Sequence, residues 1–591
     1  MHSTVANSRV VIAFLLFLLL AGCTEVPERS AKAHPAWSRG ERIGVASIPQ
    51  RAGLDVTPDG QQVHVAWSVR GAKATQIIYL QLDQQANLLL QETVAPAGLS
   101  LLRHPAVIVQ SDVVYLFFSG KQTSNTEAVF VQRMLPSVQT LSEPVMLTPS
   151  DHDVSGYDVL VSSEGIDCFW STGEGLHGQL FYRRFDREGT PLTEATWLAM
   201  GSAPTAERDA AGGIHLAWTS PQRAAAQQIL YAFFTPDQPI GPVAGTHISD
   251  IVTRAGILMK PLQLGLDTTH VYLVWSREFR TGLSAGTSEV EYVSFPIGQP
   301  RLIQPQTLYV PSIGEPEYTP RQDFFRIGPW VPLQGGVRGA SDYLDAPWPL
   351  RGQHAELPVV LSASLRYRVH SAIQPILVIF TGGRPAGYQV IGRTQRLSRQ
   401  TSVAADEQGN LYAIWLDIRG PGENDVYFAS TAPAALARLD QTTSNDVLIG
   451  LAATLWGMVS GLGLVPLLGV QLLPLLVLIG VFYLSGMDDD LHGLAAQVTF
   501  LLGTGLYLVI KLLVMSPVLA FPPLMRQIPS ELHTLWTWIV PFLLAFASGL
   551  VVYRYVRRSE RPVLFTGLAL FALTDGILTI MIYGPTFFHD I

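Results

Sequence analysis

The chain has 591 residues, of which 47 are acidic and 39 basic, so its formal net charge is −8. Charged residues make up 15% of the chain and are unevenly placed, because only 14 of them fall in the last 146 residues. Such an apolar tail excludes a wholly soluble protein, and the acidic balance argues against a nucleic-acid-binding protein, which presents a basic face.

The N-terminus predicts export. The apolar run at 10–20 is too short to span a bilayer core of about 30 Å and has the length of a signal-peptide core. It ends in Leu-Ala-Gly-Cys23, which resembles the lipobox of bacterial lipoproteins. The resemblance implies a signal peptide at 1–22 and a diacylated Cys23 that starts a lipidated tether at 23–44. The alternative is an ordinary signal peptide cut just before Cys23, which exports the chain equally.

Internal repeats predict a β-propeller. Several stretches consist of turn residues followed by a short run of β-forming residues that ends in an aromatic anchor. The anchors are Trp67, Phe118, Trp170, Trp218, Trp275 and Trp415, with a weaker one at Phe380. Four of them are followed by a second aromatic residue after 12 positions, which fits two antiparallel strands joined by a turn. The first five anchors are 48 to 57 residues apart, the length of a four-stranded blade with its loops.

The repeats cover residues 45–435, and we expect about seven blades, with six or eight also open. The long interval before Phe380 predicts an insertion at about 281–357, with a degenerate blade hidden there as the alternative. Of the two cysteines, Cys168 lies in a mostly apolar β run and is predicted to be buried in a strand. Two cysteines exclude a disulfide-stapled scaffold.

The last repeat carries a family resemblance. Residues 403–429 read VAADEQGNLYAIWLDIRGPGENDVYFA, which resembles the repeats of sialidase-like β-propellers in exported bacterial proteins. The resemblance implies the propeller fold. It implies little about activity, because the sialidase Asp-box (Ser-x-Asp-x-Gly-x-x-Trp) is not intact in any repeat, and the arginine triad and Tyr/Glu pair of sialidases find no match.

The apolar tail predicts a membrane domain after a linker at 436–446. The stretch from Val447 to Gly486 has no charged residue and is about twice as long as one span requires. We therefore expect two spans there, joined by a turn near Pro466, and about five helices in residues 447–591. Their predicted bounds are 447–465, 468–486, 495–515, 534–553 and 563–583.

The orientation of these helices contains a conflict. If an exported propeller precedes five spans, the loop with Arg554, Arg557, Arg558 and Arg561 lies outside, against the tendency of arginines to remain in the cytoplasm. If the stretch 447–486 instead contributes one span and a re-entrant piece, the same loop lies inside.

Four charged residues of the propeller are candidate ligand groups. Asp417 and Arg419 could face a ligand on one surface of the propeller, or form an ion pair that stabilises a turn. Arg183 and Arg277 follow blade strands and could bind an anionic ligand, or simply keep the surface soluble. No phosphate-binding loop, zinc-protease motif or serine nucleophile elbow occurs, so we expect no cofactor.

The tail holds two further candidates. Lys511 and Asp575 lie inside predicted spans, where ionisable residues are functional candidates by default. They could form an ion pair, or Lys511 could reach the membrane surface while Asp575 bonds locally. The run 488–490 with His492 offers ligands for a hard cation, but three consecutive carboxylates converge poorly on one ion, so no metal is assigned.

We therefore expect an all-β propeller followed by an α-helical transmembrane bundle, held in the cytoplasmic membrane of a bacterium with the propeller on the extracytoplasmic side. The leading hypothesis is a binding or assembly module for an envelope protein or glycan, attached to membrane lipid and without a nucleic-acid partner. The alternatives are a sialidase-like glycoside hydrolase, and a ligand sensor or transport component that uses the bundle.

Overall fold

The chain forms two compact units in the computed structural model. A β unit ends at Gln441, and a helical unit begins at Thr442. The predicted signal peptide and Cys23 lie outside the described residues. The structure describes residues 29–588 with gaps at 72–73, 112, 123–125, 136–139, 174–176, 224–225, 253–254, 313–324, 327–339, 368–369 and 524–527.

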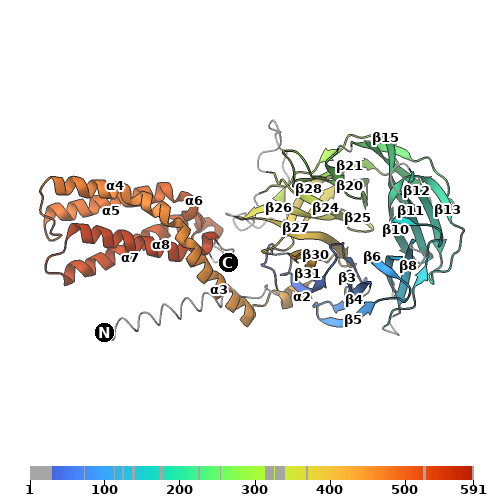
Figure 1. Cartoon of the computed structure of the whole chain (residues 1–591), viewed down its shortest axis with the longest axis horizontal. Coiled ribbons are helices and arrows are strands. Elements are labelled where there is room, and N and C mark those ends of the chain that lie inside the picture. Colours follow the sequence, from blue (N-terminus) through green and yellow to red (C-terminus); the bar gives the residue numbers. More distant parts are fainter. Residues whose placement is uncertain are drawn as a thin grey trace. The chain divides into compact units, whose positions relative to one another are not determined.

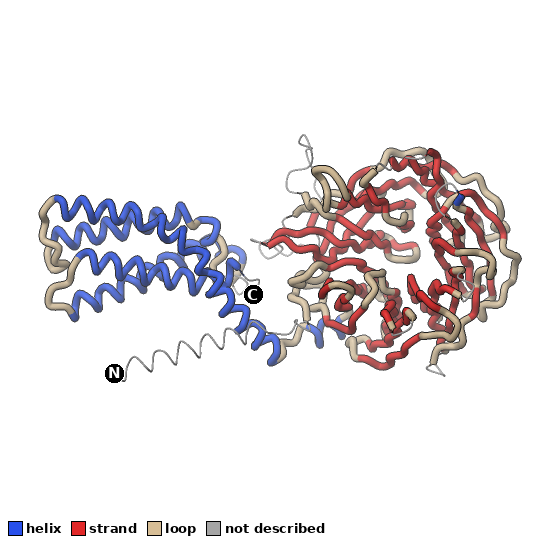
Figure 2. Tube along the Cα trace, in the orientation of Figure 1, coloured by secondary structure: helices blue, strands red, loops and turns tan. Residues whose placement is uncertain are grey.

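The β unit is a seven-bladed propeller, which confirms the predicted fold class. Its antiparallel sheets are arranged around a common centre (Figures 1 and 2). In each of the first four blades, consecutive strands pair in chain order. These blades consist of β2 (Gly53–Val56), β3 (Gln62–Arg70), β4 (Thr75–Asp83) and β5 (Leu88–Val94); β6 (Ser100–Gln110), β7 (Val113–Lys121), β8 (Glu127–Met134) and β9 (Val145–Met146); β10 (Val154–Ser162), β11 (Gly165–Thr172), β12 (Gln179–Phe185) and β13 (Thr196–Met200); and β14 (Ser202–Arg208), β15 (Ile214–Arg223), β16 (Ala226–Phe234) and β17 (Thr246–Val252).

The last three blades depart from this simple order. Blade 5 has two short extra strands, blade 6 gains a two-residue outer strand, and blade 7 takes its outer strand from the N-terminal part of the chain. They consist of β18 (Ile257–Met259), β19 (Gln263–Asp267), β20 (His270–Phe279), β21 (Ser288–Pro296), β22 (Gln306–Thr307) and β25 (Gln353–His354); β24 (Leu344–Pro349), β26 (Leu357–Tyr367), β27 (His370–Thr381), β28 (Arg384–Val390) and β23 (Phe325–Arg326); and β29 (Ser398–Ala405), β30 (Leu411–Gly420), β31 (Glu423–Ser430) and β1 (Glu41–Ala46).

The predicted insertion at about 281–357 requires a correction. This range contains β21 and β22 of blade 5, and β24, the first strand of blade 6. Phe380 lies on β27, the third strand of that blade, whereas the anchors of the clear repeats lie on second strands. The second strand of blade 6 carries Val360 and Leu361 in place of an aromatic anchor, so the repeat pattern places the start of this blade too late.

The predicted tether is also too long. Residues Glu41 to Ala46 form β1, which pairs antiparallel with β31 and completes blade 7. Arg438 extends this closure, because its guanidinium contacts the Glu41 carboxylate at 2.8 Å. Pairing the two ends of the propeller removes an open sheet edge, which would otherwise expose free N–H and C=O groups.

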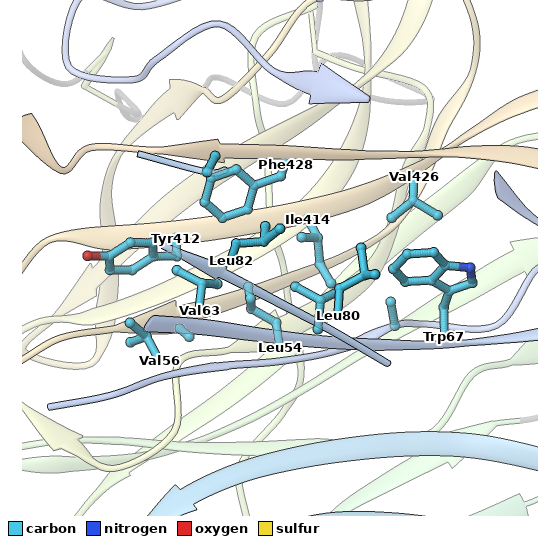
Figure 3. Close-up of a cluster of buried hydrophobic side chains, with 14 of the residues drawn as sticks. Leu54, Val56, Val63, Trp67, Leu80, Leu82, Tyr412, Ile414, Val426 and Phe428 are labelled. Atoms are coloured by element: carbon cyan, nitrogen blue, oxygen red, sulfur yellow. The ribbon is translucent and has the colours of Figure 1, made fainter. Parts of the chain in front are cut away.

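Neighbouring blades bury each other's faces. Figure 3 shows side chains of blade 1, among them Leu54, Val63 and Leu80, packed against Ile414 and Phe428 of blade 7. A second strand is covered on both faces, so its sequence is almost continuously apolar. On β11 every residue except the last is buried, and Cys168 is 0% exposed, as predicted.

Among its described residues, the helical unit holds four helical stretches long and apolar enough to cross a membrane, not five. The predicted spans 447–465 and 468–486 form one continuous helical run, because a 3₁₀ segment replaces the expected turn. Pro466 lies in the first turn of α4, where a helix tolerates proline. The elements are α2 (Pro433–Leu439), which ends the β unit, and then α3 (Ser444–Ser460), η3 (Gly461–Leu464), α4 (Val465–Leu484), α5 (Leu494–Val514), α6 (Ser516–Leu519), η5 (Ser530–Leu532), α7 (His533–Arg558) and α8 (Leu564–Phe588).

The helical run packs antiparallel along α8. A side chain added at Gly457 would meet Pro585, and one added at Gly576 would meet Leu468. A Thr443 capping box starts the run, with its hydroxyl accepting a hydrogen bond from the Asp446 N–H at 3.2 Å. Small residues at these contacts let the helix backbones approach closely, as membrane helices often do.

Candidate functional site

The two predicted ligand residues of blade 7 differ in their exposure to solvent. Asp417 is buried on β30 and accepts a hydrogen bond from Ser398 Oγ at 2.7 Å. Burial raises the pKa of Asp417 to about 6. Arg419 is exposed on the same strand, and within the described part of the chain no ion pair joins it to Asp417.

The other two predicted residues are engaged within their own blades. Arg183 on β12 donates from Nε to Thr193 O at 2.8 Å. Arg277 on β20 pairs with Glu291 at 2.7 Å and with Glu289 at 3.1 Å. The four predicted ligand residues therefore lie on three different blades and do not form one site.

A different set of charged residues meets at the centre of the propeller. Asp55 of blade 1 accepts a hydrogen bond from the Val109 N–H of blade 2 at 2.6 Å. Asp158 of blade 3 accepts one from the Ala206 N–H of blade 4 at 2.8 Å. Each carboxylate therefore satisfies a backbone donor of the next sheet, and this holds neighbouring first strands together.

Arg351 spans this centre from the other side. It lies in the loop between β24 and β26 of blade 6, yet it donates from Nη2 to Asp158 Oδ1 at 2.5 Å and from Nη1 to Val159 O at 2.7 Å. Blades 3 and 6 are as far apart as two blades can be in a ring of seven, so this side chain crosses the axis. Its exposed fraction is 34%, so solvent still reaches the guanidinium.

Three carboxylates surround Arg351. Asp158, Glu207 and Asp55 are its electrostatic partners, and we call these four residues the axial cluster. Glu207 is 5% exposed and accepts a hydrogen bond from the Gly352 N–H. Burial raises the pKa of Glu207 to about 7 and that of Asp55 to about 6, because loss of hydration outweighs the attraction of Arg351.

A second group of charges lies where the first strands begin. Lys260 pairs with Asp345, the first-strand carboxylate of blade 6. Arg51, which precedes β2, donates from Nη2 to Ala346 O at 2.8 Å, and its guanidinium lies 4.2 Å from the ring centroid of Trp348. Burial lowers the pKa of Arg51 to about 9, and the charge of Asp345 opposes this shift.

Arg399 of blade 7 completes this second group. Its guanidinium lies 5.7 Å from the ring centroid of Tyr343, whose hydroxyl donates to Asp345 at 3.0 Å. The Nε atoms of Arg51 and Arg399 are buried and have no hydrogen-bond partner among the described residues. Lys260 also pairs with Glu278 at 3.7 Å. We call Arg51, Lys260, Arg399, Asp345 and Glu278 the cationic cluster, since it holds three positive charges against two negative charges.

A hollow of about 370 Å³ lies at the same ends of the first strands, between blades 2 and 3. Its lining includes Arg103, His104, Lys121, Glu127 and Tyr157. The Tyr157 hydroxyl donates to His104 O at 2.5 Å. Because Tyr157 directly precedes Asp158, the wall of this hollow continues into the axial cluster.

The aromatic anchors of the repeats lie on second strands, whereas these charged residues lie on or beside first strands, so the repeat pattern does not reveal them. A signal exists on the first strands, where a residue at positive φ precedes a proline. His104 (φ 51°), Ala203 (φ 53°) and Ala346 (φ 52°) occupy this position before Pro105, Pro204 and Pro347. The strand register shifts at each of them, so the bulge redirects the charged neighbours towards the centre.

In the helical unit, the structure brings Lys511 and Asp575 together. Lys511 Nζ lies 2.6 Å from Asp575 Oδ2 and 2.8 Å from Thr579 Oγ1. The Tyr507 hydroxyl donates to the same carboxylate oxygen at 2.9 Å. Both charged side chains are 0% exposed, so Lys511 does not reach a membrane surface.

The acidic run 488–490 closes one end of the bundle. Asp488 lies 3.8 Å from Arg561, and the Leu491 N–H donates to Pro562 O at 2.8 Å. Asp490 pairs with His492 at 2.9 Å. No group of three His, Cys, Asp or Glu side chains able to hold a metal ion occurs among the described residues.

Comparison with known proteins adds the fold alone. No protein-family model and no curated protein matches the chain. Among solved structures, the chain is similar to the polysaccharide lyase Uly1, with 10% identity and a TM-score of 0.37, over 65% of this chain and 90% of the lyase. It is also similar to the β-propeller domain of the Trilobed protease from Pyrococcus furiosus, with 9% identity and a TM-score of 0.34, over 64% of this chain and 95% of that domain. It is also similar to a thermostable family-43 glycoside hydrolase (10% identity, TM-score 0.28, covering 45% and 99%). These are distant propeller relationships and carry no activity to this chain.

Proposed function

We propose that this protein is a binding module held on the extracytoplasmic side of a bacterial membrane, and that its propeller recognises an acidic group of an envelope glycan or protein. The observation that carries the proposal is the cationic cluster, in which positive charges outnumber carboxylates and the guanidinium groups of Arg51 and Arg399 lie against aromatic rings. Arginines stacked on aromatic rings suit recognition of carboxylates, because the planar fork is already oriented.

The axial cluster supports binding over catalysis. Asp55 and Asp158 accept backbone hydrogen bonds that join blades, and Arg351 covers Asp158. A general acid or nucleophile must instead reach a substrate atom within hydrogen-bond distance. The main role of the carboxylates at the centre is therefore to hold the blades of the propeller together.

One observation favours a sialidase-like glycoside hydrolase as the second candidate. Glu207 has a pKa of about 7 and lies near the ion-paired Asp158, and glycosidases use two carboxyl groups whose environments separate their protonation states. This candidate requires loop 350–356 to withdraw so that Arg351 uncovers the pair.

The count of four spans supports the proposed orientation. The loops 485–493 and 559–563 meet at one end of the bundle, where the Leu564 N–H donates to Asp489 O at 2.8 Å. The second loop follows three arginines and contains a fourth, Arg561, so the positive-inside tendency places this end in the cytoplasm. The propeller precedes the first span and thus falls on the opposite side, which removes the conflict that five spans created.

Ligand binding and turnover should be measured together on the full chain in lipid nanodiscs. We expect an acidic polysaccharide to bind and neutral dextran to be ignored, without release of reducing ends. Arg399→Ala, in the cationic cluster, should weaken binding about tenfold, whereas Arg419→Ala should not. Sugar release that disappears in both Glu207→Gln and Asp158→Asn would establish the hydrolase instead.

Orientation is tested by labelling introduced cysteines with a membrane-impermeant maleimide. Thr442→Cys should react in cells whose outer layers have been opened but whose cytoplasmic membrane is intact, and Ser559→Cys should react only after lysis. Of the two native cysteines, Cys168 is buried and gives little background, and labelling of the unmodified chain measures the background from Cys23. The reverse pattern would place the propeller in the cytoplasm.

A further inference from the structure

A buried histidine of blade 1 has one ring nitrogen without a partner. His64 on β3 is 1% exposed, and its Nδ1 lies 2.7 Å from the Tyr79 hydroxyl. This hydroxyl has no other acceptor among the described residues, so it donates to Nδ1 and the imidazole proton lies on Nε2. Burial lowers the pKa of His64 to about 4, so the ring is neutral at pH 7. Nε2 is therefore an N–H donor, and no described residue accepts its hydrogen bond.

The equivalent position in other blades, three residues before the aromatic anchor, shows what completes such a group. In blade 4, His215 bonds to Tyr231 at 2.7 Å in the same way, but its Nε2 lies 3.2 Å from the Asp209 carboxylate. In blade 7, the Tyr412 hydroxyl donates to Asp406 at 2.9 Å. Both aspartates start the turn between the first and second strands, and a glycine N–H three residues later donates to their backbone oxygen.

Blade 1 has a threonine where these blades have the aspartate. Thr57 starts the turn, and the Gly60 N–H donates to Thr57 O at 2.8 Å. The Thr57 hydroxyl donates to Asp59 at 2.6 Å and accepts from the Gln62 N–H at 3.0 Å, so it is used within the turn. The turn is also one residue longer than in blades 4 and 7. It therefore begins in the same way but lacks the carboxylate that would accept from His64.

His64 and Thr57 both line a pocket between blades 1 and 2. Its volume is about 370 Å³, within the range of about 300–1,000 Å³ that is typical of small-molecule sites. It lies where the first strands of these blades end, whereas the cationic cluster lies where first strands begin. We call it the histidine pocket, and its lining includes Thr57, Gln62, His64 and Gln81 of blade 1 and Met134 and Leu135 of blade 2.

The charge of the histidine pocket favours a neutral ligand. Among the described residues that line it, Asp59 is the one charged group, and no lysine or arginine occurs. Hydrogen bonds from the Thr57 hydroxyl and the Gln61 N–H hold the pKa of Asp59 below its usual value, so this carboxylate stays charged and repels anions. The acidic group proposed for the cationic cluster is therefore a poor ligand here.

The polar wall of the pocket offers donors and acceptors side by side. Gln62 and Gln81 flank His64 on one face of the sheet, and Gln81 Nε2 donates to Gln62 Oε1 at 2.7 Å. This bond leaves Gln62 Nε2 as a donor and Gln81 Oε1 as an acceptor. A sugar hydroxyl suits such a wall because one oxygen both donates and accepts, and Met134 and Leu135 offer an apolar surface to the C–H groups of a sugar ring.

We propose that the histidine pocket is a second binding site of the propeller and that it takes a neutral saccharide unit, with one sugar hydroxyl accepting a hydrogen bond from His64 Nε2. This oxygen fills the role that the Asp209 carboxylate has in blade 4. Nε2 is covered in the free protein, so binding exchanges the hydrogen bond between Gln62 and Gln81 for bonds from both amides to the sugar. The site is independent of the acidic ligand proposed for the cationic cluster.

Saturation-transfer NMR on the full chain in lipid nanodiscs tests this site. The probes are the neutral methyl glycosides of glucose, galactose, mannose and N-acetylglucosamine, and we expect at least one of them to bind. Thr57→Asp restores the carboxylate of blades 4 and 7, which should accept from His64 Nε2 and weaken sugar binding about tenfold. Thr57→Ser keeps the hydroxyl and is the matched control, with binding equal to that of the wild type.

His64→Phe removes the donor itself and should weaken binding by a similar factor. This variant also removes the acceptor of the Tyr79 hydroxyl, so Thr57→Asp decides the question if His64→Phe unfolds, because it adds an acceptor and takes none away. Binding of an acidic polysaccharide should be the same in Thr57→Asp as in the wild type. Failure of all four glycosides to bind, or equal glycoside binding by the wild type and a folded Thr57→Asp, would overturn the proposal.

Discussion

The bridge formed by Arg351 across the propeller yields the most direct prediction. Arg351→Met keeps the length and most of the apolar stem of the side chain while removing its donors and its charge. The variant loses two hydrogen bonds from a charged donor, one to Asp158 and one to Val159 O. We expect the propeller to be destabilised, because no other blade 6 side chain replaces this link to blade 3 among the described residues.

The size of the effect follows from the contacts. A hydrogen bond that involves a charged group contributes about 1.5–3 kcal/mol, so two contribute about 3–6 kcal/mol. The exposed fraction of Arg351 is 34%, so solvent screens both bonds and we halve this sum, to about 1.5–3 kcal/mol. For a unit of roughly 400 residues, this corresponds to a fall in melting temperature of about 1–4 °C.

The assay is thermal unfolding of the full chain, followed by tryptophan fluorescence at pH 7.5. Arg419→Met serves as the matched control, because Arg419 is exposed and makes no ion pair with a described residue. An equal shift in the two variants, or a higher melting temperature for Arg351→Met, would refute the idea that this loop fastens the blades at the centre.

Three further predictions concern the propeller. Glu207 has a pKa of about 7, above its usual 4.5, so its protonated form stabilises the fold below pH 4.5 and this stabilisation, roughly 3 kcal/mol, is lost as the pH rises to about 7. Glu207→Gln should therefore flatten the fall in melting temperature between pH 4.5 and pH 7. An unchanged slope would contradict this. Trp218→Ala should cost about 3–5 kcal/mol in a chemical denaturation curve, because the indole is fully buried between blades. Gly44→Val should weaken the closure by about 1–3 kcal/mol, since a Cβ there would lie 2.4 Å from Trp67 Cζ2; normal resistance to proteolysis of β1 would argue against this.

The sequence reveals the blades where a local pattern encodes them. An aromatic anchor and its partner lie on adjacent strands, as with Trp415 and Tyr427, which face each other in the ladder. Blade 6 is harder to read, because its second strand uses Val360 and Leu361 and so lacks the aromatic signal. The same limit applies to the helices, where a long apolar run does not say whether it turns or continues as one helix.

The central site could not be read from the sequence, since its contacts join residues that are distant along the chain. Arg351 and Asp158 are 193 positions apart, and neither lies in the part of the repeat that recurs. Lys511 and Asp575 are separated by only 64 positions and were found because charge is rare in apolar helices. A charged residue stands out in a sequence when it lies in a long apolar run, and Arg351 does not lie in one.

The structure separates two uses of charge in this chain. In the propeller, Asp55, Asp158 and Arg351 join neighbouring or opposite blades, so the proposed binding function rests on other groups, such as Arg51 and Arg399. In the bundle, an ion pair could be replaced by apolar residues of similar volume with little loss of stability. Its presence therefore points to a role in the helices that is distinct from anchoring, and disabling Asp575 should leave ligand binding by the propeller unchanged.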